Sequence, residues 1–95
     1  MKNKFFSVIV TTYNSSKYIE KTINSILKQN FLDYEIILVD DCSNDDTIEL
    51  VKKQFSNNVK ILSTDKNFGG PAKSRNIGIQ YSSGQWVSFL DADDF

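Results

Sequence analysis

Apolar residues along this chain alternate between two spacings, one typical of buried strands and one typical of amphipathic helices. The strand-like runs are almost continuously apolar and rich in β-branched residues, as expected for strands buried on both faces of a parallel sheet. They cover residues 5–11, 35–40, 59–62 and 85–90. The helix-like segments between them cover residues 18–27, 47–55 and 71–83. The pattern therefore predicts the element order βαβαβαβ.

This alternation predicts a doubly wound α/β fold, a mainly parallel sheet with right-handed crossovers and helices covering its faces. Phe55, Trp86 and Phe89 are expected in the core. Ninety-five residues without an internal repeat or a linker correspond to one domain. Because the chain ends in an acidic cluster directly after a strand, we expect residues 1–95 to be the truncated N-terminal part of a longer domain.

Polar residues and glycines mark the ends of the predicted helices. Residues 14–16, an Asn-Ser-Ser sequence, are N-cap candidates for the first helix, and residues 43–46 are candidates for the second. Pro71 suits the first turn of the third helix, and Gly84 suits the left-handed position after its end.

Charge and composition exclude several classes of function. Eleven Lys and Arg nearly balance twelve Asp and Glu, so we expect no electrostatic binding of nucleic acid or of an acidic membrane. The chain has no histidine, which excludes a His-based triad or a His-ligated zinc site within it. No apolar run approaches the roughly 20 residues of a membrane span. The single cysteine, Cys42, forms no internal disulfide and fits a reducing cytoplasm.

Polar side chains follow three of the predicted strands at the point where each strand ends. These segments are residues 11–14, 40–43 and 91–94. Because the carboxyl ends of parallel strands meet at one edge of a sheet, we expect the polar groups to converge there. Several carboxylates at one edge repel each other unless a cation balances them. Oxygen ligands without His or Cys favour Mg²⁺ or Mn²⁺ over zinc.

Asp91 and Asp93 are the strongest metal-binding candidates. In an extended segment, residues two apart point the same way and lie about 6–7 Å apart. One carboxylate can then hold the metal while the other reaches a sugar hydroxyl or a metal-bound water. The alternative is an acidic segment that is merely solvated. The position of Asp91 and Asp93 directly after a predicted buried strand favours the metal site.

Three further residues are candidates for ligand binding, each with a structural alternative. Only one of Asp40 and Asp41 is expected to face the cleft and accept hydrogen bonds from a ribose or a base, while Asp45 and Asp46 cap the next helix. Arg75, the only arginine, lies in the first turns of the third helix, where an anion or a base carbonyl is favoured; the alternative is a solvated arginine on the helix surface. Tyr13 is placed either to stack on a base or to pack.

Four ordered blocks of the sequence resemble the N-terminal half of family 2 glycosyltransferases of the GT-A fold. The blocks are Ser7–Asn14, Ser25–Thr47, Gly70–Gly78 and Gly84–Asp94, the last ending in a D-x-D motif. Together they cover nearly the whole chain, and four blocks at compatible spacing are more specific than any single one. Cys42 departs mildly from the pattern, because Gly or Ser is more usual after the acidic pair.

The resemblance implies a fold of the nucleotide-diphospho-sugar transferase type. It also implies which residues bind the nucleoside and which bind the metal and the diphosphate. The residues implied around the nucleoside, usually uridine, are Thr11, Tyr13, Asp41 and Arg75. Asp91 and Asp93 are implied to contact the ribose and the metal-bridged diphosphate. Of the two, Asp93 is the one implied to bind the metal directly. The implied cofactor is Mg²⁺ or Mn²⁺.

The implied reaction is transfer of a sugar from a nucleotide-diphosphate donor, typically UDP-sugar, to an acceptor hydroxyl with inversion. The implied acceptor is a glycan or a lipid-linked acceptor, as in polysaccharide or cell-surface glycan synthesis. In the family the catalytic base lies beyond the D-x-D motif, so we expect it beyond Phe95 and expect these residues alone to be inactive. The expected location is cytoplasmic, with association on the cytoplasmic membrane face left open for the full-length protein.

Three other classes of protein compete with this interpretation of the residues. In a phospho-acceptor receiver domain the acidic pair follows the first strand, whereas Asp40 and Asp41 follow the second. A phosphatase with a D-x-D-x-[TV] motif is disfavoured because Phe95 stands where Thr or Val is needed. A non-catalytic nucleotide-sugar binding module fits the same residues as the enzyme.

Overall fold

The computed structural model describes residues 6–14, 16–28, 34–64, 71–83 and 86–91, and these contain the seven predicted elements in the predicted order. The strands are β1 (Phe6–Thr12), β2 (Tyr34–Asp40), β3 (Val59–Ser63) and β4 (Trp86–Asp91). The helices are α1 (Ile19–Leu27), α2 (Thr47–Phe55) and α3 (Pro71–Tyr81). No helix within the described ranges is long and apolar enough to cross a membrane.

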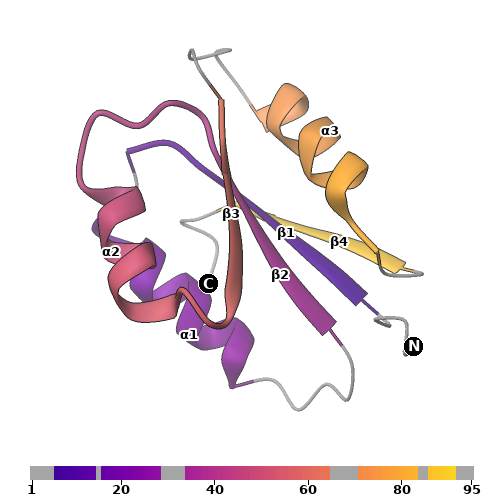
Figure 1. Cartoon of the computed structure of the whole chain (residues 1–95), viewed down its shortest axis with the longest axis horizontal. Coiled ribbons are helices and arrows are strands. Elements are labelled where there is room, and N and C mark those ends of the chain that lie inside the picture. Colours follow the sequence, from indigo (N-terminus) through magenta and orange to yellow (C-terminus); the bar gives the residue numbers. More distant parts are fainter. Residues whose placement is uncertain (1–5, 15, 29–33, 65–70, 84–85, 92–95) are drawn as a thin grey trace.

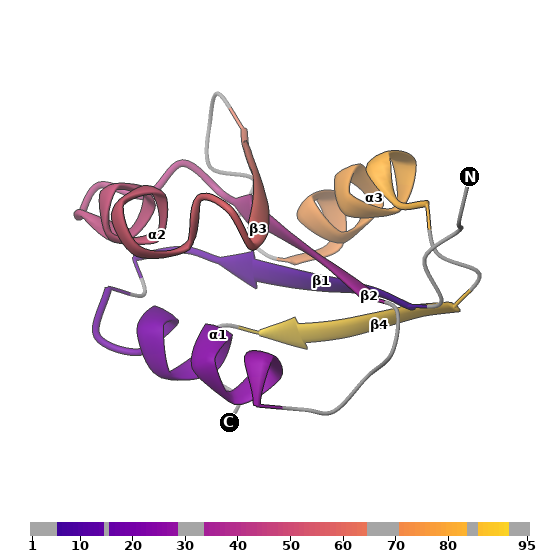
Figure 2. The same ribbon diagram turned by 60° about the horizontal axis from the view of Figure 1, so that its bottom comes forward.

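The four strands form one parallel sheet in the order β3-β2-β1-β4, which confirms the doubly wound α/β fold. The chain starts in β1, moves outward through β2 to β3, and then crosses back to place β4 on the other side of β1. The arrowheads of β1 and β4 point the same way in Figure 2. Successive strands are thus added on one side of β1 up to β3 and on the other side at β4, so the winding of the sheet reverses between β1 and β4.

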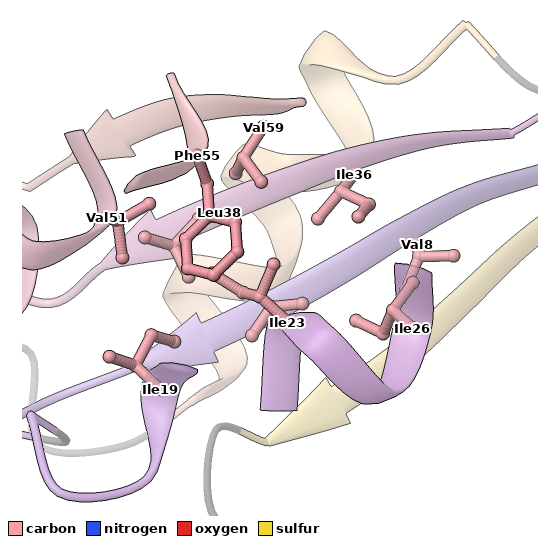
Figure 3. Close-up of a cluster of buried hydrophobic side chains, with 10 residues drawn as sticks. Val8, Ile19, Ile23, Ile26, Ile36, Leu38, Val51, Phe55 and Val59 are labelled. Carbon is pink, nitrogen blue, oxygen red and sulfur yellow. The ribbon is translucent and has the colours of Figure 1, made fainter. Parts of the chain in front are cut away.

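The two faces of the sheet are covered by different helices. Figure 1 shows α1 and α2 together on one side and α3 apart from them, and in Figure 2 α1 and α3 lie on opposite sides of the sheet. The larger core cluster lies under α1 and α2 (Figure 3), and its buried side chains are Val8, Val10, Ile19, Ile23, Ile26, Ile36, Leu38, Val51, Phe55 and Val59. Each such side chain contributes about 1.5–3 kcal/mol on burial.

The second cluster lies on the opposite face, beneath α3. It contains Ile9, Ile37 and Val39, with Ile77 of α3 packed against it. Gly78 allows α3 to approach β1 closely, because a Cβ built at this glycine would lie 2.5 Å from Ile9 Cγ2. Alternate residues of the central strands thus face different helices, which explains their nearly continuous apolar character.

Phe89 corrects the predicted core. Phe55 is buried as expected, at 6% exposed, but Phe89 is 42% exposed. In the sheet register Phe89 pairs with Ile9, so it lies on the face that α3 covers. Because α3 packs over β1 and β2, it leaves this part of β4 open to solvent. The side chain of Trp86 lies outside the described residues.

The predicted helix caps are confirmed only in part. α1 begins at Ile19 after Tyr18, without a side-chain cap, while Asn14 and Ser16 bind the neighbouring loop. At α2, Asp46 occupies the N-cap without a side-chain hydrogen bond, whereas Asp45, also predicted to cap this helix, accepts from the Thr47 N–H at 3.0 Å. α3 ends at Tyr81 rather than Ser83, and Ser15 and Gly84 lie outside the described residues.

Glu35 holds the amino ends of the strands together. Its Oε2 accepts hydrogen bonds from Ser7 Oγ at 2.6 Å and from the N–H and Oγ of Ser83 at 2.7 and 3.0 Å. Burial raises the pKa of Glu35, but these hydrogen bonds and the charge of Lys60 outweigh it, so the pKa lies below its ordinary value. The carboxylate is therefore a structural link between β1, β2 and the segment after α3.

Candidate functional site

The carboxyl ends of all four strands meet at one edge of the sheet, as the sequence predicts. The register places Thr12 beside Asp40, Asp40 beside Ser63, and Thr11 beside Asp91. We call this edge the carboxyl rim. The backbone of Asp91 belongs to it, whereas the Asp91 side chain and Asp93 lie outside what the structure describes. Their predicted role as metal ligands therefore stays a prediction.

The carboxyl rim has one place where a ligand is favoured by topology. In an open doubly wound sheet, ligands bind outside the carboxyl ends of the strands where the winding reverses. Here that point lies between β1 and β4, at Thr11 and Asp91. Thr11 is buried, while Tyr13, two residues on, is 45% exposed and presents its ring to solvent. The topology thus selects the same strand ends as the sequence.

Asp41 is fixed by contacts from both neighbouring strands. Its N–H donates to Thr12 O at 2.8 Å, and its Oδ1 accepts from Thr64 Oγ1 at 3.1 Å. The residue is 6% exposed. Thr64 was not identified as a site residue from the sequence; a hydroxyl two residues after the third predicted strand was the available clue. Its hydrogen bond orients the Asp41 carboxylate at the rim.

Asp40 has a different environment from Asp41. It is 1% exposed, and its carboxylate accepts from the Ser43 N–H at 2.8 Å and from Ser43 Oγ. Asp40 therefore closes the turn after β2. The expectation that one acid of the pair binds the ligand stays a prediction, and Asp41 remains the candidate because Asp40 is used by the turn.

Two residues in the loops after β1 and β2, Asn14 and Cys42, have a left-handed backbone conformation. Cys42 has φ 60° and Asn14 has φ 49°, and these are the two non-glycine residues with positive φ in the described ranges. Left-handed backbone costs a non-glycine residue on the order of 1–3 kcal/mol and tends to cluster at functional sites. Both residues lie at the carboxyl rim. The Cys42 thiol is free and partly buried.

Asp45 connects the loop after β2 to the loop after β1. Its Oδ2 accepts from the Ser16 N–H at 3.2 Å, and its Oδ1 accepts from the N–H and Oγ1 of Thr47. Burial raises the pKa of Asp45, but the hydrogen bonds from Thr47 and Ser16 outweigh it and hold the pKa below its ordinary value. Asp45 is thus an ionised structural acceptor.

Arg75 bridges α3 and β4. Its guanidinium carbon lies 5.5 Å from the centroid of the Phe89 ring, within the range of a cation–π interaction. The exposed Phe89 side chain, which the sequence predicted in the core, therefore packs against the guanidinium group of Arg75. Phe89 lies two residues before Asp91, the last residue of β4, so Arg75 lies beside the strand that borders the reversal of winding, and its role in ligand binding stays a prediction.

Metal ligands cannot be assembled from the described side chains alone. Among them, no group of three or more His, Cys, Asp or Glu residues could hold a metal ion. The strand end beside Thr11 continues in the sequence as Asp91-Ala92-Asp93-Asp94, an oxygen-only donor set. Such donors fit Mg²⁺ or Mn²⁺.

Comparison with known proteins agrees with this geometry. A model of the family described as Glycosyl transferase family 2 matches residues 7–95. The poly(ribitol-phosphate) β-N-acetylglucosaminyltransferase TarS of Staphylococcus aureus is 45% identical over 93 residues, which cover 95% of this chain and 16% of TarS. The chain therefore spans about a sixth of this curated relative.

Two solved structures have the same fold over nearly the whole chain. A crystal structure of S. aureus TarS 1–349 with UDP-GlcNAc superposes with a TM-score of 0.88 at 45% identity, covering 94% of this chain and 26% of that one. The mannosyltransferase PcManGT of Pyrobaculum calidifontis, solved with GDP-Man and Mn²⁺, gives a TM-score of 0.87 at 25% identity, covering 98% and 28%.

Proposed function

Because this chain belongs to glycosyl transferase family 2, we propose that its carboxyl rim binds the nucleoside diphosphate of a sugar donor. The observation that carries the proposal is the meeting of Thr11, Asp41 and Asp91 at the carboxyl ends of parallel strands, beside the reversal of winding. Family membership also decides against the receiver-domain alternative. The donor class that we propose is UDP-sugar, the kind of donor bound in the TarS structure.

The nucleoside is proposed to lie against the ends of β1 and β2. Tyr13 offers an exposed ring for stacking on the base. Asp41, oriented by Thr64, accepts hydrogen bonds from the base or the ribose. Arg75 supplies donors for a base carbonyl or a phosphate from the α3 side, and Thr11 forms the floor between them. An aromatic ring, a carboxylate acceptor and a guanidinium donor together provide the contacts that a base and a ribose require.

The diphosphate is proposed to lie at the end of β4, with Asp91 and Asp93 holding Mg²⁺ or Mn²⁺. The oxygen-only donor set and the Mn²⁺ in the PcManGT structure support this assignment. When bound, such a cation stabilises the negative charge that develops on a departing diphosphate. Asp91 is the last residue of β4 and pairs with Thr11 of β1, so the proposed metal site lies next to the proposed nucleoside site.

The whole protein is proposed to transfer the sugar to a hydroxyl of a glycan or lipid-linked acceptor with inversion. In such a displacement the acceptor oxygen bonds to the anomeric carbon as the diphosphate leaves, and a general base takes the hydroxyl proton. We expect that base in the sequence beyond Phe95. A role in the synthesis of a polysaccharide or cell-surface glycan is proposed, in line with the activity named for TarS. A cytoplasmic location is proposed separately, because the chain has a single cysteine.

Calorimetric titration with UDP in the presence of Mn²⁺ tests the donor site. We expect binding that is lost when EDTA removes the metal. We expect Asp41→Asn to weaken UDP binding by about tenfold, because a hydrogen bond to a charged acceptor contributes roughly 1.5–3 kcal/mol and one to a neutral acceptor roughly 0.5–1.5 kcal/mol. Asp46→Asn is the matched control, since Asp46 is exposed and its side chain does not cap α2. A folded chain that fails to bind UDP with Mn²⁺ would contradict the proposal.

A further inference from the structure

Asn14 joins the loop after β1 to the loop after β2. Its N–H donates to Ser43 Oγ at 2.8 Å. Its side-chain Oδ1 accepts from the N–H groups of Asn44 and Asp45 at 2.7 and 3.3 Å. One residue thus makes three hydrogen bonds to three consecutive residues of the other loop, and the two loops are held as one unit.

The backbone of Asn14 is suited to this position. Its φ of 49° is left-handed, a conformation that Asn and Asp adopt more readily than other non-glycine residues. The left-handed turn directs the Asn14 N–H and the side chain toward the same loop. Gly would keep the backbone conformation but lose the acceptor, whereas Asp would keep both. This difference separates the two contributions experimentally.

The connection made by Asn14 continues into the buried sheet. Ser43, which accepts from Asn14, in turn donates to the carboxylate of the buried Asp40 at the end of β2. On the other side, the Asp41 N–H donates to Thr12 O. Asn14 therefore closes a ring of hydrogen bonds that contains both Tyr13 and Asp41.

We propose that Asn14 is a positioning residue that fixes Tyr13 relative to Asp41 and so sets the affinity for the nucleoside of the donor. The inference rests on the proposed function, since it assigns Tyr13 and Asp41 to the nucleoside. Tyr13 precedes Asn14 directly, and Asp41 lies two residues before Ser43. Without the hydrogen bonds of Asn14, the loops after β1 and β2 become ordered only when the nucleoside binds. The free energy of this ordering lowers the affinity for the nucleoside.

Two variants and three measurements test the inference. Asn14→Gly removes the acceptor, and Asn14→Asp retains it. Without ligand, amide hydrogen exchange of Asn44 and Asp45 is expected to be faster in Asn14→Gly. With Mn²⁺, Asn14→Gly is expected to bind UDP about tenfold more weakly. Asn14→Asp is expected to stay within about threefold of the wild type, since Asp and Asn are comparable acceptors for backbone N–H groups.

Inorganic pyrophosphate with Mn²⁺ serves as the third measurement, because it probes the metal end of the site without a nucleoside. Its affinity is expected to be the same in the wild type and in both variants. Equal losses of UDP and pyrophosphate affinity would overturn the inference, because Asn14 would then support the whole site. Unchanged exchange at Asn44 and Asp45 in Asn14→Gly would overturn it independently of any ligand. A wild-type chain that binds no UDP would contradict the proposed function itself.

Discussion

Three carboxylates of the sheet, Glu35, Asp40 and Asp41, differ in their hydrogen-bond partners, and we assign a structural role to two of them and a ligand role to the third. At the amino ends, Glu35 accepts from Ser7 and Ser83. At the carboxyl ends, Asp40 accepts twice from Ser43. Both acids use their acceptor capacity to hold the chain together. Asp41, oriented by Thr64 at the carboxyl rim, is the acid that we assign to the donor.

Glu35 is expected to make the stability of the domain depend on pH. Its pKa lies below the ordinary value of 4.5, so its ionised form is stabilised by folding. This contribution is complete above the unfolded-state pKa and is lost as the pH falls through the lower folded-state pKa. Urea unfolding of the wild type should therefore show stability falling below pH 4.5, and Glu35→Gln should show a smaller fall.

Glu49→Gln provides the control for this comparison, because Glu49 is exposed on α2. Its pH profile is expected to follow that of the wild type. If Glu35→Gln shows the full wild-type loss of stability in acid, then Glu35 is not the carboxylate responsible. Asp45, whose pKa is also lowered, would be the next candidate.

Residue type and position were sufficient to select Asp41, Arg75 and Tyr13 as candidates from the sequence. They were not sufficient to find Thr64 and Asn14, whose hydrogen-bond partners lie 23 to 31 residues away in the chain. Both are common loop residues with ordinary local explanations. Only the tertiary structure shows that they orient other groups.

At the scale of secondary-structure elements, β1 is one of the two inner strands of the sheet, and it connects the outer strand β4 to the rest. It pairs with both β2 and β4, and α3 lies against it through Gly78. The absence of a side chain at Gly78 lets the helix backbone approach the buried Ile9. The distance between α3 and the sheet also determines where Arg75 lies, so this contact affects the site as well as the core.

Gly78→Ala is expected to destabilise the domain by about 1–2 kcal/mol. The new Cβ would lie 2.5 Å from Ile9 Cγ2, and a clash this close belongs in the upper part of the roughly 1–3 kcal/mol range for overpacking. The gain in helix propensity, roughly 1 kcal/mol, offsets part of this cost. Urea unfolding monitored by circular dichroism would measure the change. Asn76→Ala, at an exposed position of the same helix, is expected to be neutral or stabilising. An unaltered or higher stability of Gly78→Ala would show that α3 is not held this close.

The existence, type and order of the elements followed from apolar periodicity, because both faces of the sheet must be covered. Their ends followed less well. The predicted caps of α1 failed because Asn14 and Ser16 bind across to the loop after β2 instead of to their own helix. The exposure of Phe89 was not predicted, because an apolar residue in a strand does not reveal whether a helix lies over that strand.

At the scale of the whole molecule, the direction of the strands determines where the chemistry lies. Parallel pairing in the order β3-β2-β1-β4 brings Thr11, Asp41 and Asp91 to one edge, although they are up to 80 residues apart in the chain. The sequence predicted this convergence from the alternation of strands and helices alone. It did not predict the strand order, which depends on how the third crossover returns past β1 and which places the reversal between β1 and β4.

Paramagnetic broadening by Mn²⁺ in the presence of UDP tests the central claim most directly, since it locates the metal on the folded chain. In a ¹H–¹⁵N correlation spectrum, we predict loss of the amide signals of Thr12, Asp41 and Asp91 at the carboxyl rim. The amides of Ser7 and Glu35, at the opposite edge, should keep their intensity. Broadening centred on Ser7 and Glu35, or spread evenly over the sheet, would contradict a donor site at the carboxyl ends of the strands.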